Sequence, residues 1–371
     1  MTYLAALWLL AAAQTRTAAP AAFERVAQEA AQARGQNRIE EAIRLYRQAV
    51  SMRPSWPEGW WFLGELLYEQ DKYTDARDAV RRLIVLDPKS GPGFALLGLC
   101  EYETHEYKQA LADINEGRRL GLGEDPQVKR VVLYHAVLLF TRFGMFESAR
   151  QVLEMVVKLG GTGRAVIDAA GLAGLRRPAL PEEMRPDEQE LVELAGRAVC
   201  AVAEDHAAEA RNYFNELLAK YPATPNVHYL YGTFLQAKDR DAAIAEFQKE
   251  LELNARHKEA LVTLALEYEQ QGDVDRALSY AQRAVDAAPQ FFAAHLVRGR
   301  LFSNAGESEK GIQELEIARK QAPDSPQVHF ALAAAYSIAG RKEDAARERA
   351  EFLRLKQMAD ETTGRDTVAH P

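Results

Sequence analysis

Residues of three kinds recur at intervals of 34 positions along this 371-residue sequence. A fixed period of this length constrains the fold strongly, because it is the signature of an array of repeated units and not of one globular core. The recurring positions are Gly272, Gly306 and Gly340; Pro289 and Pro323; Gly64 and Gly98; Pro54 and Pro88; and Ala42, Ala76 and Ala110.

Apolar residues inside each period follow a helical spacing. Leu261, Leu264, Ala265 and Tyr268 form one stripe, which ends at a break containing Gly272. A second stripe follows, and a proline ends it; the residues are Ala277, Tyr280, Ala281, Ala284 and Pro289. Each period is therefore predicted to be an antiparallel pair of helices, and the fold class to be all-α.

The unit resembles a tetratricopeptide repeat. Trp60, Leu63 and Gly64 match the opening of that family's signature, with Ala76 and Pro88 at its later positions. The resemblance implies a right-handed superhelix of about nine helix-turn-helix units. These are expected to begin near Phe23, Pro57, Gly91, Arg130, Leu191, Pro225, Lys258, Phe292 and Pro326.

A small residue stands at one position of every second helix, where the two helices of a hairpin should cross closely. Those residues are Ala42, Ala76, Ala110, Ala149, Ala210, Ala243, Ala277, Gly311 and Ala345. The matching small residues of the first helices are Ala30, Gly64, Gly98, Ala198, Gly232, Ala265, Gly299 and Ala333, and Val137 is the exception.

The predicted repeats do not cover the whole sequence, because one internal segment and both ends lie outside them. Residues 162–190 contain a short apolar helical stretch and then a Pro-rich, acidic segment, which we interpret as a degenerate half-unit and a connector. It should divide an N-terminal arm of about four units, 23–161, from a C-terminal arm of about five, 191–357. Residues 14–22 are expected to be a flexible lead and 358–371 a frayed polar tail.

The segment from Leu4 to Ala13 is apolar and uncharged. It is too short to span a bilayer, which takes roughly 20 residues, but it suits the core of a secretory signal over residues 1–13, with Gln14 as the new terminus. Met1-Thr2-Tyr3 lacks the usual Lys or Arg, so a buried first helix or a misassigned start remains the alternative. We expect a bacterial protein that is periplasmic or secreted, with a cytoplasmic location as the alternative.

Composition and motifs exclude several classes of function. Asp and Glu outnumber Lys and Arg, 54 to 46, which argues against a protein that neutralises nucleic-acid phosphates. Cys100 and Cys200 lie in apolar runs and form no disulfide framework or metal motif. The sequence contains no P-loop, nucleophile elbow or dinucleotide fingerprint. We therefore predict no enzyme activity, no catalytic residues, no cofactor and no bound metal.

Three histidines occupy the signature tryptophan position of their units: His228, His295 and His329. They could form a metal ladder or a pH switch. The alternative is that each packs where the tryptophan would pack. Equivalent residues of neighbouring units lie roughly 10 Å apart, whereas zinc ligands lie about 2 Å from one ion, so we favour packing.

The concave side of such a superhelix is a long groove lined by first helices, which suits an extended peptide or a partner helix. The resemblance places ligand contacts on that face. The predicted groove residues are Trp61, Glu65, Tyr68, Tyr102, Glu103, Tyr134, Tyr229, Thr233, Arg300 and Phe330. The alternative is that several of them pack against neighbouring units.

The function expected from these observations is a non-catalytic scaffold that binds a protein or peptide segment. The alternative is an accessory subunit of a cell-envelope assembly or glycan-processing enzyme. The inner positions lack the Lys and Asn residues with which co-chaperone members of the family hold a C-terminal carboxylate, so binding of chaperone tails is not expected.

Overall fold

The structure is a computed structural model that describes residues 21–367, with side chains as far as Met358. Every regular element in this described part is an α-helix or a short 3-10 helix, and it contains no strand. The predicted all-α fold class is confirmed. The expected signal segment, residues 1–13, lies outside the described residues, as does most of the expected lead.

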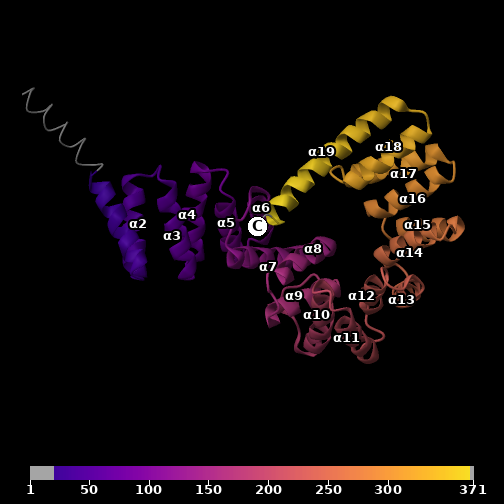
Figure 1. Ribbon diagram of the computed structural model, residues 1–371, viewed down its shortest axis with the longest axis horizontal. Helices are drawn as coiled ribbons and strands as arrows, with labels where there is room; N and C mark the ends of the chain where they lie inside the picture. The colour runs from indigo at the N-terminus through magenta and orange to yellow at the C-terminus, as the bar shows by residue number, and fades with distance from the viewer. Residues whose placement is uncertain (1–20, 368–371) are drawn as a thin grey trace, which may run out of the picture. The chain divides into compact units, whose positions relative to one another are not determined.

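Contacts divide the chain into two compact units; of the described residues, the first holds 21–139 together with 365–367, and the second holds Phe140–Gly364. In the first unit a helix over residues 21–35 precedes consecutive helices that pack on one another as hairpins (Figure 1). These are α2 (Ile39–Met52), α3 (Pro57–Glu69), α4 (Tyr73–Leu86), α5 (Gly91–Glu103), α6 (Tyr107–Leu120) and α7 (Pro126–Arg142), the last of which crosses the boundary.

The second unit continues the same hairpin arrangement. Its elements are α8 (Phe146–Lys158), α9 (Arg164–Gly174), η1 (Pro181–Glu183), η2 (Pro186–Glu188), α10 (Gln189–Ala203), α11 (Ala207–Lys220), α12 (Val227–Leu235), α13 (Arg240–Leu253), α14 (Lys258–Gln270), α15 (Val274–Ala287), α16 (Phe292–Asn304), α17 (Ser308–Gln321), α18 (Pro326–Ile338) and α19 (Lys342–Thr367).

Helix starts explain two departures from the predicted boundaries. α7 begins at Pro126 because Asp125 accepts a hydrogen bond from the backbone of Gln127 at 2.8 Å, which caps the helix before the expected Arg130. α12 begins at Val227 because Asn226 is left-handed, with φ of 73°. The other first helices from Pro57 onward begin at, or within two residues of, the predicted positions.

The 34-residue step of glycines reflects one turn per hairpin. Gly272, Gly306 and Gly340 follow the first helices of their units with φ of 76°, 86° and 73°. This left-handed conformation ends a helix readily when the residue has no Cβ. Asp71 and His105 hold the same conformation in the first unit, with φ of 57° and 62°.

Small residues lie where the helices of a hairpin cross. A Cβ at Gly98 would lie 2.9 Å from the carbonyl oxygen of Ala110, and one at Gly299 would lie 2.9 Å from that of Gly311. The second-helix alanines at this position are buried, from Ala42 to Ala345. No larger side chain fits between backbones this close.

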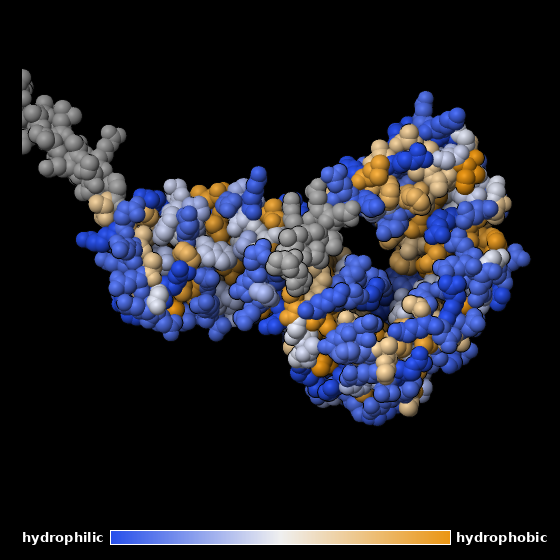
Figure 2. Space-filling model, viewed as in Figure 1, coloured by the Kyte–Doolittle hydropathy of each residue, from blue (hydrophilic) through white to orange (hydrophobic). Residues whose placement is uncertain are grey.

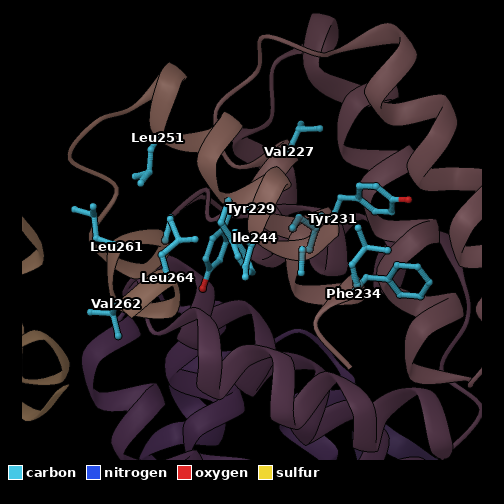
Figure 3. Packing of buried hydrophobic residues seen from close by; sticks show 14 of the residues in the cluster. Val227, Tyr229, Tyr231, Phe234, Ile244, Leu251, Leu261, Val262 and Leu264 are labelled. Carbon is cyan, nitrogen blue, oxygen red and sulfur yellow. The ribbon is translucent and has the colours of Figure 1, made fainter. Parts of the chain in front are cut away.

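The largest core cluster lies in the second unit. Figure 3 shows Tyr229 of α12 beside Ile244 of α13 and Leu264 of α14, whereas Tyr231 and Phe234 of the same helix point the other way. The rings of Tyr231 and Phe234 pack on Phe214 of α11, with centroids 5.1 Å and 5.0 Å away. First and second helices of successive units thus contribute to one continuous apolar interior, as a stacked array requires.

Residues 162–190, which were predicted to be a half-unit and connector between two arms, form α9, η1 and η2 inside the second compact unit. α9 packs closely on α10, since a Cβ at Gly171 would overlap the carbonyl oxygen of Val192 and one at Gly196 that of Ile167. The connector after it is fixed by an ion pair between Arg142 and Glu183. The interruption is therefore an integral part of the second unit.

The segment predicted to be a polar tail, 358–371, is helical as far as Thr367. α19 continues as a helix to that residue. Its sequence from Met358 onward contains no proline, and its one glycine is Gly364. The second helix of the last unit therefore extends beyond the repeat, although Asp, Thr and Gly, which rank low in helix propensity, make up much of this extension.

Candidate protein-binding groove

A groove of about 740 Å³ lies on the first helices α16 and α18 of the second unit and is closed on one side by α19. Two of the predicted groove residues, Arg300 and Phe330, line it together. Its apolar wall is formed by Leu296, Phe330, Ile338 and Phe352, and its floor by three alanines of α18. We call this site the Phe330 groove.

The sequence of α18 explains why this face is open. Val328, Leu332 and Tyr336 are buried against the rest of the unit. Phe330 and Ile338, two turns apart on another face, are 61% and 56% exposed. Figure 2 shows hydrophobic surface over α18. Phe330 and Ile338 are thus large, apolar and strongly exposed, and alanines lie between them. Such a patch is typical of a protein-binding surface.

The charges at the groove are positive. Arg300 donates to a carboxylate oxygen of Glu269 at 3.1 Å, and Asn304 donates to the other oxygen at 3.2 Å. Lys356 is exposed at the opposite wall. Among the described residues that line the groove there is no Asp or Glu.

Each helix of the groove is fixed to its neighbour by a histidine. On α16, His295 contacts the Pro289 carbonyl oxygen through Nε2 at 2.9 Å and Glu314 of α17 through Nδ1 at 2.7 Å. His329 of α18 repeats this with the Pro323 carbonyl at 2.7 Å and Glu348 of α19 at 2.5 Å.

The same arrangement occurs at His228, which contacts the Pro222 carbonyl and Glu246. In the first unit Trp60 donates its indole N–H to the Pro54 carbonyl at 2.8 Å. The three histidines therefore pack where the signature tryptophan packs, as we favoured. Both nitrogens of each ring are engaged, and among the described residues no group of three His, Cys, Asp or Glu side chains could hold a metal ion.

Two other predicted residues border a second cavity of about 400 Å³ between α8, α10, α12 and α14. Thr233 is exposed there. Tyr229 is only 8% exposed, so its prediction as a groove contact needs correction. Its ring packs against His257 and Phe247, with centroids 4.7 Å and 5.7 Å away, and burial raises the pKa of its hydroxyl.

The predicted residues of the first unit are mostly engaged in packing. Trp61 and Tyr68 are half-buried against the apolar cluster of that unit. Glu65 is bonded to Arg34 at 3.5 Å, and burial raises the pKa of the carboxyl. A cavity of about 410 Å³ in this unit is lined by Trp60 and not by Trp61.

Tyr102, Glu103 and Tyr134 are also half-buried. The Tyr102 ring meets His135 edge to face at 4.8 Å, and Tyr134 meets the same histidine at 5.4 Å. These aromatic residues contact one another or their neighbours, which matches the packing alternative better than a shared ligand surface.

Of the described residues that line the groove, the sequence predicted Arg300 and Phe330 and missed the rest, among them Ile338, Phe352 and Lys356. Ile338 carried a usable signal, because it lies eight residues after Phe330 on the same helix, about 80° around the helix axis, and so within one broad apolar stripe. Phe352 and Lys356 carried none, since both belong to a second helix, whereas the predicted groove is lined by first helices.

Both cysteines are buried. Burial raises the pKa of the Cys100 thiol to about 12 and that of Cys200 to about 11. Thiols that stay protonated are poor nucleophiles and poor metal ligands, which agrees with the expectation that these residues act as small apolar side chains.

No helix in the described part of the chain is long and apolar enough to cross a membrane. Two family models match the sequence. One describes the tetratricopeptide repeat and matches residues 28–91; the other describes the middle TPR-like domain of cilia and flagella-associated protein 70 and matches residues 188–356. Together they span more than half of the chain.

Two curated relatives are much longer than this chain. It is 24% identical over 291 residues to human protein O-mannosyl-transferase TMTC3, a match covering 73% of this chain and 31% of the relative. It is 29% identical over 157 residues to cellulose synthase operon protein C of Xanthomonas axonopodis pv. citri (strain 306), covering 40% of this chain and 10% of the relative.

Solved structures match about half of the chain. MamA 41-end from Desulfovibrio magneticus RS-1 is 20% identical, with a TM-score of 0.38, covering 48% of this chain and 98% of that one. YrrB, described as a TPR protein with an unusual peptide-binding site, is 15% identical, with a TM-score of 0.37, covering 48% and 93%.

Proposed function

This chain belongs to the tetratricopeptide repeat family, and from that premise we propose that it is a non-catalytic scaffold that binds a peptide or protein segment. We place the binding in the Phe330 groove. The observation that carries the proposal is the exposure of Phe330 and Ile338 beside a cavity large enough for several side chains.

The non-catalytic part of the proposal is supported by the chemistry of the groove. The described residues that line it include no Asp, Glu, His or Cys. Its one hydroxyl, on Ser303, donates to the backbone carbonyl of Gly299 at 2.9 Å. A nucleophile needs a base within hydrogen-bond reach, and this lining offers none, whereas exposed aromatic and Arg side chains are typical of binding hot spots.

A photocrosslinking amino acid placed at position 330 of the full chain tests the proposal. We expect a discrete crosslinked partner whose segment can be mapped by mass spectrometry, and the same probe at Ile317 should yield none. Ile317 is a suitable control because it is an exposed apolar residue on α17, outside the groove. Equal capture from both positions would mean that the groove is not the binding surface.

A second candidate is an accessory subunit of an envelope-assembly or glycan-processing enzyme, with no chemistry of its own. The names of the two relatives favour it, since one is a protein O-mannosyl-transferase and the other belongs to a cellulose synthase operon. Purification of the tagged chain from its native cells should then retain a glycan-acting enzyme, and its loss should lower that enzyme's activity.

We further propose that the chain is exported, from the apolar run Leu4–Ala13 and the small residues before Gln14. The intact mass of the chain isolated from its native cells tests this. Removal of residues 1–13 and recovery outside the cytoplasm are expected. A chain that keeps these residues and fractionates with the cytoplasm contradicts export.

A further inference from the structure

The Phe330 groove has the dimensions of a seat for a helix. From Phe330 to Ile338 the open face of α18 spans about 12 Å, or two helical turns. Ala331, Ala334 and Ala335 lie between these two side chains; Ala334 is exposed, whereas Ala331 and Ala335 are buried at the bottom of the groove. Small residues let a second helix approach to the closer end of the usual 8–10 Å between axes.

The polar groups of the groove argue against an extended occupant. The backbone of α16 and α18 is already paired within the helices, so no free strand edge is available. Ser303 donates to Gly299, while Arg300 and Asn304 donate to Glu269. An extended peptide on the alanine floor would leave its own N–H and C=O groups unpaired, whereas a helix pairs them internally.

The charges of the groove predict which residues flank the apolar face of a bound helix. The chain as a whole is acidic, with a formal net charge of −8, yet the cations Arg300 and Lys356 line the groove and no carboxylate does so among the described residues. Arg300 uses one of its five N–H donors on Glu269, so others remain for a partner carboxylate.

We infer that the occupant is an acidic amphipathic α-helix of a partner protein, a conclusion that rests on the proposed function of the groove. Large apolar side chains of the helix pack on the contacting rings of Phe330 and Phe352, whose centroids are 5.4 Å apart, and against Ile338. Its Glu or Asp residues, one turn to either side of that apolar face, lie toward Arg300 and Lys356. The complex weakens with salt because these ion pairs are at the rim.

Fluorescence anisotropy with the full chain and labelled peptides tests this inference. The probe is a designed amphipathic peptide of about 18 residues, or five helical turns, with Leu and Phe on one face and Glu at its flanks. A second peptide carries Lys in place of Glu, and a third carries a central proline. We expect the acidic helix to bind at least about tenfold more tightly than either, which is about 1.4 kcal/mol.

Variants of the chain locate the binding. Phe330→Ala should weaken the acidic peptide about tenfold, as loss of a hot-spot aromatic does. Lys356→Glu should weaken the acidic peptide and strengthen the Lys peptide. Ile317→Ala is the matched control and should change neither. Unchanged circular dichroism of each variant excludes unfolding as the cause.

The outcomes separate this inference from the proposed function. Phe330-dependent binding of the proline or Lys peptide, with no preference for the acidic helix, overturns the inference and leaves the groove as a binding site. Self-association of the chain that Phe330→Ala abolishes also overturns it, since a second copy is then the occupant. No Phe330-dependent binding, together with no crosslinked partner at position 330, overturns both.

Discussion

At the scale of single residues, hydrogen bonds explain how a hairpin of this array accommodates a buried histidine. His228, His295 and His329 each lie between a carbonyl oxygen and a carboxylate oxygen, both of which only accept hydrogen bonds. The second oxygen of each glutamate is bonded to a cation, Lys249, Arg298 or Arg319. Each ring is thus fixed at both of its nitrogens, whereas Trp60 is fixed by its single N–H.

A carboxyl group in the first unit should make stability depend on pH. Burial, a hydrogen bond with Glu101 and the charge of Glu101 raise the pKa of Asp113 from 3.8 to about 7. The folded chain thus binds this proton more tightly than the unfolded chain. The resulting stability is complete below about pH 4 and is lost as the pH rises through 7.

Asp113→Asn should therefore raise the melting temperature of the first unit at pH 8, by roughly 2–4 °C, and change it little at pH 4. Thermal unfolding followed by circular dichroism at both pH values measures this. Asp78→Asn removes the same charge from an exposed position of α4 and serves as the control. An equal effect of the two substitutions at pH 8 would show that net charge, and not the Glu101 contact, is responsible.

At the scale of the helical element, the turn glycines and the crossing residues have different roles. Gly306 has open space around its Cα, and its φ of 86° is what excludes other residues. Gly299 has no special backbone conformation, but a Cβ there would lie 2.7 Å from Leu315. The same residue type thus recurs in the period for two unrelated physical reasons.

Gly306→Ala should destabilise the second unit by about 1 kcal/mol, because an L-residue is strained at this left-handed position. Gly35→Ala is the matched control. Gly35 also has open space but lies in the helix over residues 21–35, where alanine should stabilise by up to about 1 kcal/mol. Urea denaturation measures both. A stabilising effect of Gly306→Ala would contradict the turn assignment.

At the scale of the whole molecule, the chain is an array in which each hairpin contacts its neighbours. Consecutive helices pack on one another within each compact unit, and first helices such as α14, α16 and α18 also contact in sequence. Stability in such an array is approximately a sum of local terms. A substitution that destabilises the core of one unit should therefore have little effect on the stability of the other unit.

Phe247→Ala tests this independence. Phe247 is fully buried in α13, so the truncation should cost about 3–5 kcal/mol. Native-state hydrogen exchange should show lost protection in α12, α13 and α14 and unchanged protection in α2, α3 and α4. Equal loss in all of these helices would mean that the two units unfold as one cooperative body.

The helix pairs, their approximate boundaries and the family could be predicted from the sequence alone. The 3.6-residue stripes, the small residues at the hairpin crossing and the turn residue of each period depend on contacts between neighbours in the chain. Such contacts leave a local pattern. The histidines at the tryptophan position were predictable for the same reason.

The tertiary structure alone decided which side chains form the site. Phe330, Phe352 and Lys356 meet in one groove because α19 continues beside α18, and no spacing within either helix encodes that approach. Tyr229 was expected to face a ligand, but residues of other helices, Phe247 and His257, cover it. Exposure depends on what the neighbouring units place on a surface, and a sequence period records the helices but not what covers them.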